Sequence, residues 1–304
     1  MAGGIDYINN PGLHPKILLA EAIYRGYDVP IATQILPEQL SVEDLILHYY
    51  DYTDTVFESP KLAPPGTTAP TSAGYFAMHQ VEAKPYRLGA VLDDWTTNQS
   101  WHKGNAYANT ITSLYNQFML QQEYDVMYAL SDTSTFTSIG NSTKTSNYWD
   151  DNVNGDPIKD VLNAIKTIRE TAKAIPNSFI ITSEIHATLM SRPDVQRLMF
   201  QGNQNSQVAN GVMTNFLGLD VFVNNTITKT TGTWAESTTF LNDEKAFILE
   251  RGDMLGITHV AEPMQFNTWR EDASRGVHVE LLKTFAPTIW RQTRDYFYAT
   301  VMST

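Results

Sequence analysis

A segment rich in acidic and amide side chains begins at Asp150, with the sequence Asp-Asp-Asn-Val-Asn-Gly-Asp. Asp150, Asn152 and Asn154, followed by Gly155, match the first half of a calcium-binding loop, where alternate oxygens face one cation and glycine permits a sharp turn. The second half does not match, because Val161 occupies the twelfth position, where such a loop has a bidentate glutamate. The alternative is an Asx-rich turn that leads into the following helix. The segment is therefore a calcium candidate with an incomplete ligand set.

The remaining polar residues form no recognisable catalytic motif. The seven histidines show no i, i+4 pairing and no His-Glu-x-x-His sequence, so a zinc-enzyme site is not indicated. No nucleophile elbow, phosphate-binding loop or dinucleotide-binding motif occurs, and zero cysteines excludes a thiol nucleophile and disulfides. Arg251-Gly252-Asp253 is interpreted as a β-turn between strands rather than as a cell-adhesion tripeptide. We expect a protein that is not an enzyme and needs no cofactor.

Composition excludes further classes. The formal net charge is -12 and the pI is near 4.9, and the lysines and arginines are scattered, which argues against a nucleic-acid-binding protein. Hydrophobic residues make up 42% of the chain and charged residues 18%, as in a folded globular protein. No apolar run approaches the roughly 20 residues of a membrane helix, and the N-terminus does not resemble a signal peptide. We expect a soluble protein.

The clearest regular structure lies between Asp156 and Asp253. Asp156 can cap a helix, and Pro157 suits the first helical position. Apolar residues then recur at helical spacing, and Pro176 stops the pattern. The recurring residues are Ile158, Val161, Leu162, Ile165 and Ile168.

Strands and shorter helices follow this helix. Residues 179–182 predict a buried strand, and residues 183–200 predict helical segments interrupted near Pro193. A Gln/Asn-rich gap comes next, and residues 216–223 and 239–253 predict two further strands. The module therefore alternates helix and strand but contains no catalytic signature.

The N-terminal part has a different character. Residues 1–13 predict an extended arm, residues 16–27 predict a helix, and a second helix is expected after Ser41, with Leu45 and Ile46 on its apolar side. The C-terminal residues 257–302 alternate as strands.

A long two-stranded hairpin is expected between residues 51 and 92. Its predicted strands are 56–61 and 75–91, and the intervening Lys61–Gly74 holds three prolines and two glycines. Such strands bury little within one subunit, so another element must cover them. Residues 105–130 then predict the longest helix, spanning roughly 37 Å.

This order of elements resembles the major capsid proteins of tailed double-stranded DNA viruses, the Hong Kong 97-type capsid fold that encapsulins also use. The resemblance covers residues 50–304 and depends on element order more than on any single motif. The segments that carry it are the hairpin leading through Ala90–Trp95 into the long helix, Pro176–Thr182, Arg192–Val195, Gly218–Val223 and Leu249–Asp253.

The resemblance implies an α+β fold with defined parts. These are an N-terminal arm with helices (1–50), an extended loop (51–92), a peripheral domain (93–154 with 241–304) containing a spine helix at 105–130, and an axial domain (155–240). It further implies two interface regions, the tip of the extended loop and a loop at the symmetry axis. The residues concerned are Lys61, Pro64, Pro65 and Gly66 at the tip, and Gln201, Asn203, Asn205 and Asn210 in the axial loop. Lys61 is either a solvated lysine or, as in some relatives, one partner of an isopeptide cross-link.

The function implied is that of a major capsid protein that self-assembles as hexamers and pentamers into an icosahedral shell around viral double-stranded DNA. The implied partners are further copies of the chain and portal, scaffold and decoration proteins, with no sequence-specific DNA binding and no membrane. The implied location is the virion capsid, assembled in the host cytoplasm. The alternatives are an encapsulin-type nanocompartment around a protein cargo and an α/β enzyme that uses only the 156–253 module.

Overall fold

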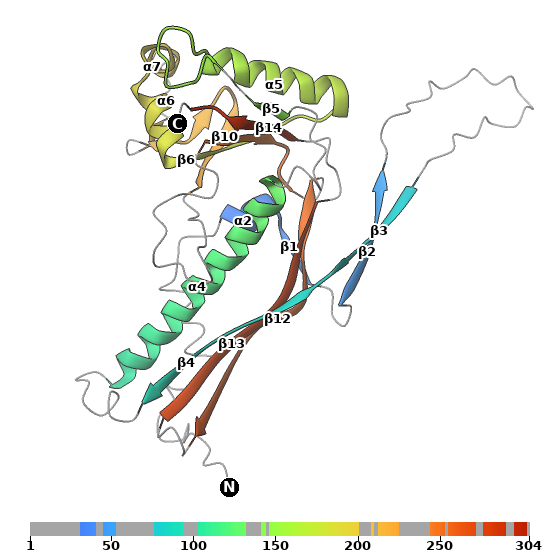
Figure 1. Cartoon of the computed structure of the whole chain (residues 1–304), viewed down its shortest axis with the longest axis vertical. Helices are drawn as coiled ribbons and strands as arrows, with labels where there is room; N and C mark the ends of the chain where they lie inside the picture. Colours follow the sequence, from blue (N-terminus) through green and yellow to red (C-terminus); the bar gives the residue numbers. More distant parts are fainter. Residues whose placement is uncertain are drawn as a thin grey trace, which may run out of the picture.

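The structure, a computed structural model, describes residues 31–40, 45–52, 76–93, 103–131, 141–143, 146–200, 208–209, 212–224, 244–252, 255–271, 276–289 and 295–302. Over these residues the chain builds a four-stranded sheet beside a long helix, and a six-stranded sheet with helices on both faces (Figure 1). A two-stranded ribbon stands apart from both sheets. The class is α+β, as the sequence predicts.

The four-stranded sheet has the order β1-β12-β13-β4. Its strands are β1 (Glu38–Leu40), β12 (Gly256–Glu271), β13 (Gly276–Ile289) and β4 (Lys84–Asp93). β1 is parallel to β12, and the other pairs are antiparallel. The helix α4 (Lys103–Ser131) covers one face of the sheet. Alternate residues of β13 pack beneath this helix, since successive strand side chains point to opposite faces. The buried contact set is Leu92, Ile111, Leu114, Phe118, Val260, Val279, Leu281 and Phe285.

The six-stranded sheet has the order β5-β14-β11-β6-β10-β9. Its strands are β5 (Asn141–Thr143), β14 (Asp295–Thr300), β11 (Ala246–Leu249), β6 (Ser178–Thr182), β10 (Leu219–Asn224) and β9 (Asn215–Phe216). β6 is buried along its whole length, which explains the apolar Phe179, Ile180 and Ile181 at its centre. One face packs on the helices that follow Asp156, and the other face meets the C-terminal half of α4.

Three helices accompany the six-stranded sheet. α5 (Pro157–Ala172) begins as predicted, because the Asp156 carboxylate accepts a hydrogen bond from the backbone amide of Lys159 at 2.9 Å. It ends before Pro176, at Lys173, which adopts a left-handed conformation with φ 53°. α6 (Ser183–Ser191) and α7 (Pro193–Phe200) are separated at the proline, also as predicted.

A short N-terminal segment joins the two sheets. α2 (Ile31–Ile35) inserts Ala32, Ile35 and Leu36 between α4 and the six-stranded sheet. The chain then enters β1, where the Thr258 hydroxyl donates to the Leu36 carbonyl at 3.3 Å. These three buried apolar side chains therefore fill the space between α4 and the six-stranded sheet.

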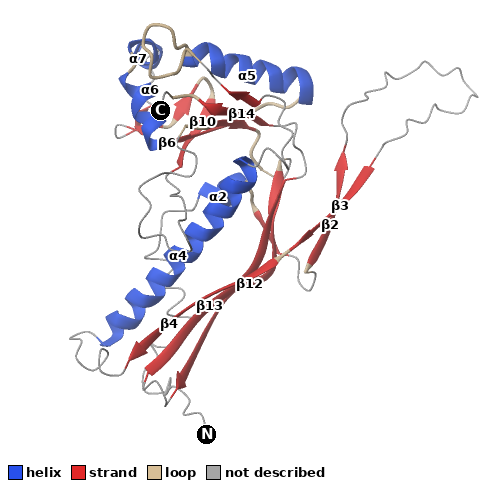
Figure 2. Ribbon diagram, viewed as in Figure 1, coloured by secondary structure: helices blue, strands red, loops and turns tan. Residues whose placement is uncertain are grey.

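The ribbon consists of β2 (Ile46–Tyr52) and β3 (Phe76–Glu82), paired antiparallel. β3 continues through Ala83 into β4, so the ribbon projects directly from the four-stranded sheet (Figure 2). The helix expected after Ser41 is therefore wrong over residues 46–52. This segment has three tyrosines and an isoleucine, which favour a strand, and pairing with β3 satisfies its backbone.

A second difference concerns residues 216–223, which the sequence predicts as one strand. They form the end of β9, a turn at Leu217 and Gly218 with φ values of 54° and 85°, and most of β10. The long helix is confirmed as α4, and Gly252 makes a turn after β11, with φ 113°. The six-stranded sheet also includes β11 and β14, which lie beyond the expected axial boundary at residue 240. The predicted arm (1–13) and first helix (16–27) lie outside the described residues.

A small hairpin, β7 (Val208–Ala209) with β8 (Val212–Met213), precedes β9. Among the described residues, no helix combines the length and the apolar character needed to cross a membrane.

Candidate functional site

The interface residues predicted from sequence all lie outside the residues that the structure describes, so they stay predictions. They are Lys61, Pro64, Pro65, Gly66, Gln201, Asn203, Asn205 and Asn210. The described elements next to them are β2 and β3 on one side, and α7 and β7 on the other.

The predicted calcium segment is organised by Asp151, not by Asp150. The Asp151 carboxylate accepts the amides of Val153 at 2.8 Å and Asn154 at 3.2 Å, and the Asn154 side-chain amide at 2.8 Å. These hydrogen bonds, that from the Asn154 side chain first, hold the pKa of Asp151 below its ordinary value. The geometry is an Asx turn, the alternative offered by the sequence.

Metal binding by Asp150, Asn152 and Asn154 stays a prediction. Within the described part of the chain, no group of three or more Asp, Glu or His side chains is placed to hold a metal ion.

Arg192 is the centre of the most connected polar cluster in this region. It lies between α6 and α7, and its side chain is 3% exposed. Its guanidinium donates to three backbone carbonyls: Trp149 at 2.8 Å, Asp151 at 2.9 Å and Gly155 at 2.7 Å. Its remaining N–H groups reach Asp194 at 3.0 Å, so all five donors are used. Arg192 therefore fixes the 149–155 loop against the helices.

The loop is anchored and tightly packed at both ends. Trp149 is fully buried, packs against Phe179 with the two rings tilted by 58°, and donates its indole N–H to Asp160 at 2.8 Å. At the other end, a Cβ on Gly155 would lie 2.0 Å from the Tyr148 carbonyl oxygen. Only glycine fits there, because the obstacle is backbone.

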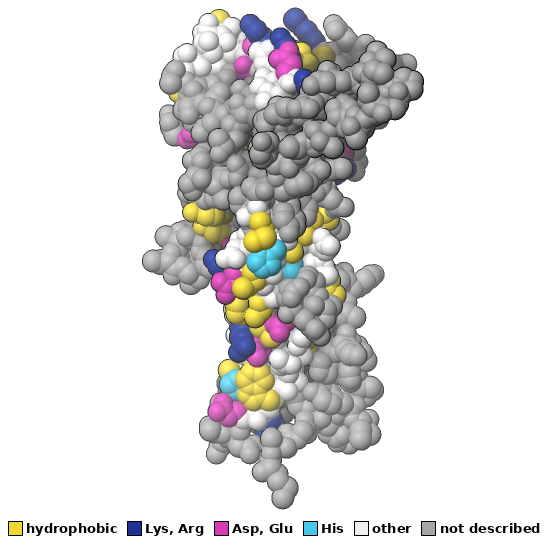
Figure 3. All heavy atoms as spheres, turned by 90° about the vertical axis from the view of Figure 1, so that its right-hand side faces the viewer, with side chains coloured by type: hydrophobic (Ala, Val, Ile, Leu, Met, Phe, Trp, Pro, Cys, Tyr) yellow, Lys and Arg dark blue, Asp and Glu magenta, His cyan; other side chains and the backbone are white. Residues whose placement is uncertain are grey.

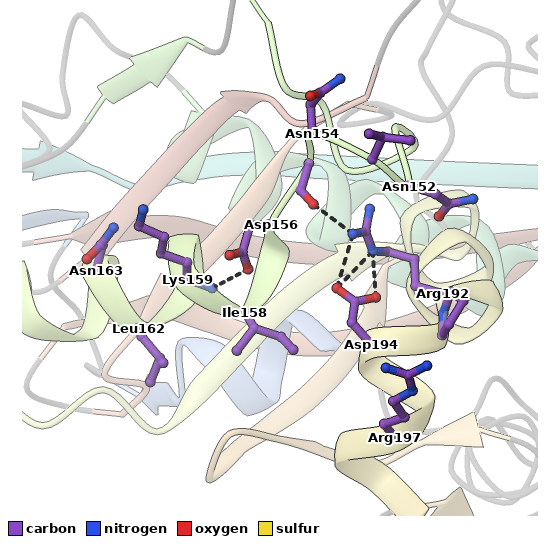
Figure 4. Close-up of a pocket in the computed structure, with 13 residues that line it drawn as sticks. Asn152, Asn154, Asp156, Ile158, Lys159, Leu162, Asn163, Arg192, Asp194 and Arg197 are labelled. Carbon is purple, nitrogen blue, oxygen red and sulfur yellow. Dashed lines mark hydrogen bonds and ion pairs between the residues drawn. The ribbon is translucent and has the colours of Figure 1, made fainter.

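A groove of about 840 Å³ lies between this loop, the start of α5 and α7 (Figure 4). Its apolar lining comes from Val153, Ile158 and Leu162, and its cations are Lys159 from α5 and Arg197 from α7. Partial burial disfavours the Asp194 carboxylate, but Arg192 outweighs this effect, so the pKa of Asp194 lies below its ordinary value. The hydrogen bonds of Arg192 therefore fix the loop that forms one side of the groove.

A second buried cluster ties α4 to the four-stranded sheet and β1. The Lys283 ammonium donates to Glu38 at 2.7 Å and to the Gln122 carbonyl oxygen at 2.9 Å. The Gln122 amide also donates to Glu38 at 2.7 Å. Burial disfavours the Glu38 carboxylate, but Lys283 and the hydrogen bonds from Lys283 and Gln122 outweigh it, so the pKa of Glu38 lies below its ordinary value. Three separate segments therefore meet in one closed network.

The projecting ribbon and the sheet face turned away from α4 expose apolar side chains. Leu45 lies at the base of the ribbon, and Ile46 and Met78 lie in its strands; these residues are 56%, 47% and 62% exposed. The open sheet face mixes hydrophobic, charged and histidine side chains (Figure 3). There Trp269 stacks on His278 with ring centroids 5.2 Å apart, and His278 contacts Glu271 at 2.7 Å. These surfaces suit contacts with other proteins better than catalysis.

Sequence reasoning missed both polar clusters. The Arg192-Pro193 break was visible, but the role of Arg192 was not, because its partners are backbone carbonyls rather than a motif. Lys283 and Glu38 lie 245 positions apart. The available signal was that Lys283 alternates with Val279, Leu281 and Phe285 and therefore lies on the apolar face of its strand.

Comparison with known proteins gave matches in structure only: no family model matches the chain, and no curated protein matches its sequence. A crystal structure of a phage-related protein from Bordetella bronchiseptica superposes with a TM-score of 0.69 at 13% identity, covering 93% of this chain and 96% of that one. The capsid of cyanophage P-SCSP1u gives a TM-score of 0.65 at 10% identity, covering 90% and 89%.

The chain has the Hong Kong 97-type capsid fold. A virus-like particle from Pyrococcus furiosus also matches, with a TM-score of 0.57 at 12% identity over 92% of this chain and 96% of that one. The expected spine helix and extended loop stay predictions as parts of this fold; α4 spans the residues of the first, and the β2–β3 ribbon overlaps the second.

Proposed function

We propose that this chain is the major capsid protein of a tailed virus, and that it assembles as hexamers and pentamers into an icosahedral shell around double-stranded DNA. The observation that carries the proposal is the likeness over nearly the whole chain to a subunit of a cyanophage capsid. The likeness covers 90% of this chain and 89% of that one, so it is not limited to one common module.

The physical character of the ribbon supports this role. A two-stranded ribbon is marginal by itself, and its unpaired edges favour association. The exposed Leu45, Ile46 and Met78 add apolar surface to those edges. In a closed shell, a neighbouring copy covers this surface, so the edges that favour unspecific association instead form a contact between subunits. The tip (Lys61, Pro64, Pro65, Gly66) and the axial loop (Gln201, Asn203, Asn205, Asn210) are proposed to contribute contacts of this kind.

The charge of the chain fits the enclosure of DNA without sequence-specific binding. A net charge of -12 gives no extended cationic surface that would hold the packaged duplex. Portal, scaffold and decoration proteins are the further partners proposed, and assembly is proposed to take place in the host cytoplasm.

An encapsulin-type nanocompartment is the second candidate, and the likenesses to phage capsids favour the virus over it. The two candidates share a shell and differ in its contents.

Electron microscopy of the purified full-length chain tests the proposal. Closed particles are expected, and particles recovered from the native host are expected to contain nuclease-protected DNA. Monomers that never form closed particles under any assembly condition would contradict both candidates. Particles that enclose a specific protein and no DNA would favour the nanocompartment.

A further inference from the structure

The groove beside Arg192 is bordered by the 149–155 loop, on which Val153 is exposed to solvent. Val153 is 88% exposed, although it sits on a loop fixed by Asp151 and by three hydrogen bonds from Arg192. Leu162, across the groove on α5, is 50% exposed. An aliphatic side chain held in place loses little conformational entropy when a partner covers it. The groove is therefore preorganised for contact.

The carboxylates and the exposed cations that line the groove differ in whether they have a partner within the chain. The nearby carboxylates are engaged within the chain: Asp156 caps α5, and Asp194 pairs with Arg192. The Lys159 ammonium and the Arg197 guanidinium, in contrast, contact no acceptor among the described residues. A complementary partner must supply carboxylates together with an apolar side chain.

We infer that this groove docks an acidic segment with an apolar side chain that belongs to a second copy of the chain. The inference rests on the proposed self-assembly and adds a specific contact surface to it. The chain has 33 acidic residues against 21 basic ones, so its own surface offers the required carboxylates. A contact between two different patches of identical subunits is heterologous, and such contacts close into rings when the rotation between neighbouring subunits closes.

A nucleic-acid occupant fits the groove less well. Binding along a phosphate backbone needs several free cations in a row. Further along α5, Lys166 is paired with Glu170 at 3.7 Å, and Lys173 donates to the Glu170 carbonyl at 2.8 Å. Lys159 and Arg197, next to the aliphatic Ile158 and Leu162, suit a peptide segment with carboxylates better than a nucleic-acid duplex.

The absence of cysteine in the chain allows a single-site probe. A Val153→Cys variant, in the full chain, is labelled with a maleimide photo-cross-linker while dispersed and is mixed with ¹⁵N-labelled chains. The mixture is then assembled and irradiated. Mass spectrometry distinguishes cross-links within one copy from cross-links between a light and a heavy copy. Lys166→Cys is the control, because Lys166 lies on α5 outside the groove and its side chain is 70% exposed.

Mixed light–heavy products are expected from Val153→Cys in about tenfold excess over the control, at a peptide that contains Asp or Glu. A label that prevents assembly at Val153→Cys but not at Lys166→Cys also supports the inference. Products confined to one copy, products with nucleic acid or another protein, or equal effects at both positions overturn it. Failure of the unmodified chain to form particles contradicts the proposed function itself, and the inference with it.

A charge test checks the same contact without a label. Arg197→Glu with Lys159→Glu is expected to lower particle yield about tenfold, whereas Lys166→Glu leaves the yield unchanged. Circular dichroism and thermal unfolding confirm that the variants fold. A folded double variant that assembles as well as the unmodified chain overturns the inference.

Discussion

The guanidinium of Arg192 donates a hydrogen bond to the carbonyl oxygen of Gly155 at 2.7 Å, although 37 positions separate the two residues. One buried side chain thereby closes the 149–155 loop onto the start of α7. Because the loop also forms the rim of the groove, the packing of this domain and the shape of its exposed surface depend on the same contact.

Replacing Arg192 is expected to destabilise the six-stranded domain strongly. In Arg192→Met, the carbonyls of Trp149, Asp151 and Gly155 lose their donors, and Asp194 loses its counter-ion. The expected decrease in the free energy of unfolding is about 3 kcal/mol, measured by urea denaturation of dispersed subunits. Arg197→Met is the control, because Arg197 is exposed and makes no hydrogen bond or ion pair with the described residues; a change within about 0.5 kcal/mol is expected there. Equal losses in both variants would contradict the role assigned to Arg192.

Gly155 is expected to tolerate no side chain. A Cβ there meets the carbonyl oxygens of Tyr148 at 2.0 Å and Asp151 at 2.7 Å, so the loop backbone must move. Gly155→Ala is expected to cost about 3 kcal/mol of unfolding free energy. The comparison is Gly218→Ala, where φ is +85° but no atom lies within 4 Å; this change costs only the left-handed strain, about 1 kcal/mol. The reverse order of the two losses in thermal unfolding would show that the clash is relieved.

Local signals in the sequence predict the elements whose stabilising contacts are local. α5 is an example, because its cap, first-position proline and apolar stripe all lie within the helix itself. The break at Pro193 has the same basis. The overall order of elements follows from these units and carries the resemblance to the capsid fold.

The features that the sequence did not predict depend mainly on contacts between residues far apart in the chain. Ile46–Tyr52 becomes a strand because β3, which begins at Phe76, pairs with it. In the turn between β9 and β10, Leu217 has a φ of 54°; leucine rarely adopts this conformation, so the sequence does not predict a turn there. The partners of Arg192 are carbonyls, which every residue has. Pattern reasoning therefore located the domain but not the groove.

The Lys283–Glu38 pair is expected to respond asymmetrically to substitution. The Lys283 side chain is 4% exposed and the Glu38 side chain 36% exposed. Glu38→Gln leaves a buried ammonium without its counter-ion and is expected to cost about 3 kcal/mol. Lys283→Met leaves a carboxylate that water can reach, so a loss of about 1 kcal/mol is expected.

The double variant separates pairing from unrelated packing effects. Glu38→Gln with Lys283→Met is expected to be more stable than the sum of the two single losses predicts, because neither charge is then left alone. Urea denaturation of the four proteins completes the cycle. Strict additivity would mean that the two side chains do not interact energetically.

The last prediction concerns pH and the hairpin next to the axial loop. The backbone amide of Met213 donates to Nε2 of His186 at 3.0 Å, and this requires a neutral imidazole. Burial lowers the pKa of His186 below its ordinary value of 6.5. The unfolded chain therefore binds the proton first, so the contact is fully stabilising above pH 6.5 and is lost as the pH falls below that value toward the folded pKa.

Hydrogen exchange at the Met213 amide measures this contact. Its protection factor, corrected for intrinsic exchange, is expected to fall as the pH drops below 6.5, and to be low at every pH in His186→Ala. The Val221 amide, which donates to the Thr214 carbonyl at 3.0 Å, is the internal control because its acceptor does not titrate. If both amides lost protection together, the cause would be opening of the whole domain. Loss at Met213 alone would assign the change to His186, because only that acceptor is removed by a proton.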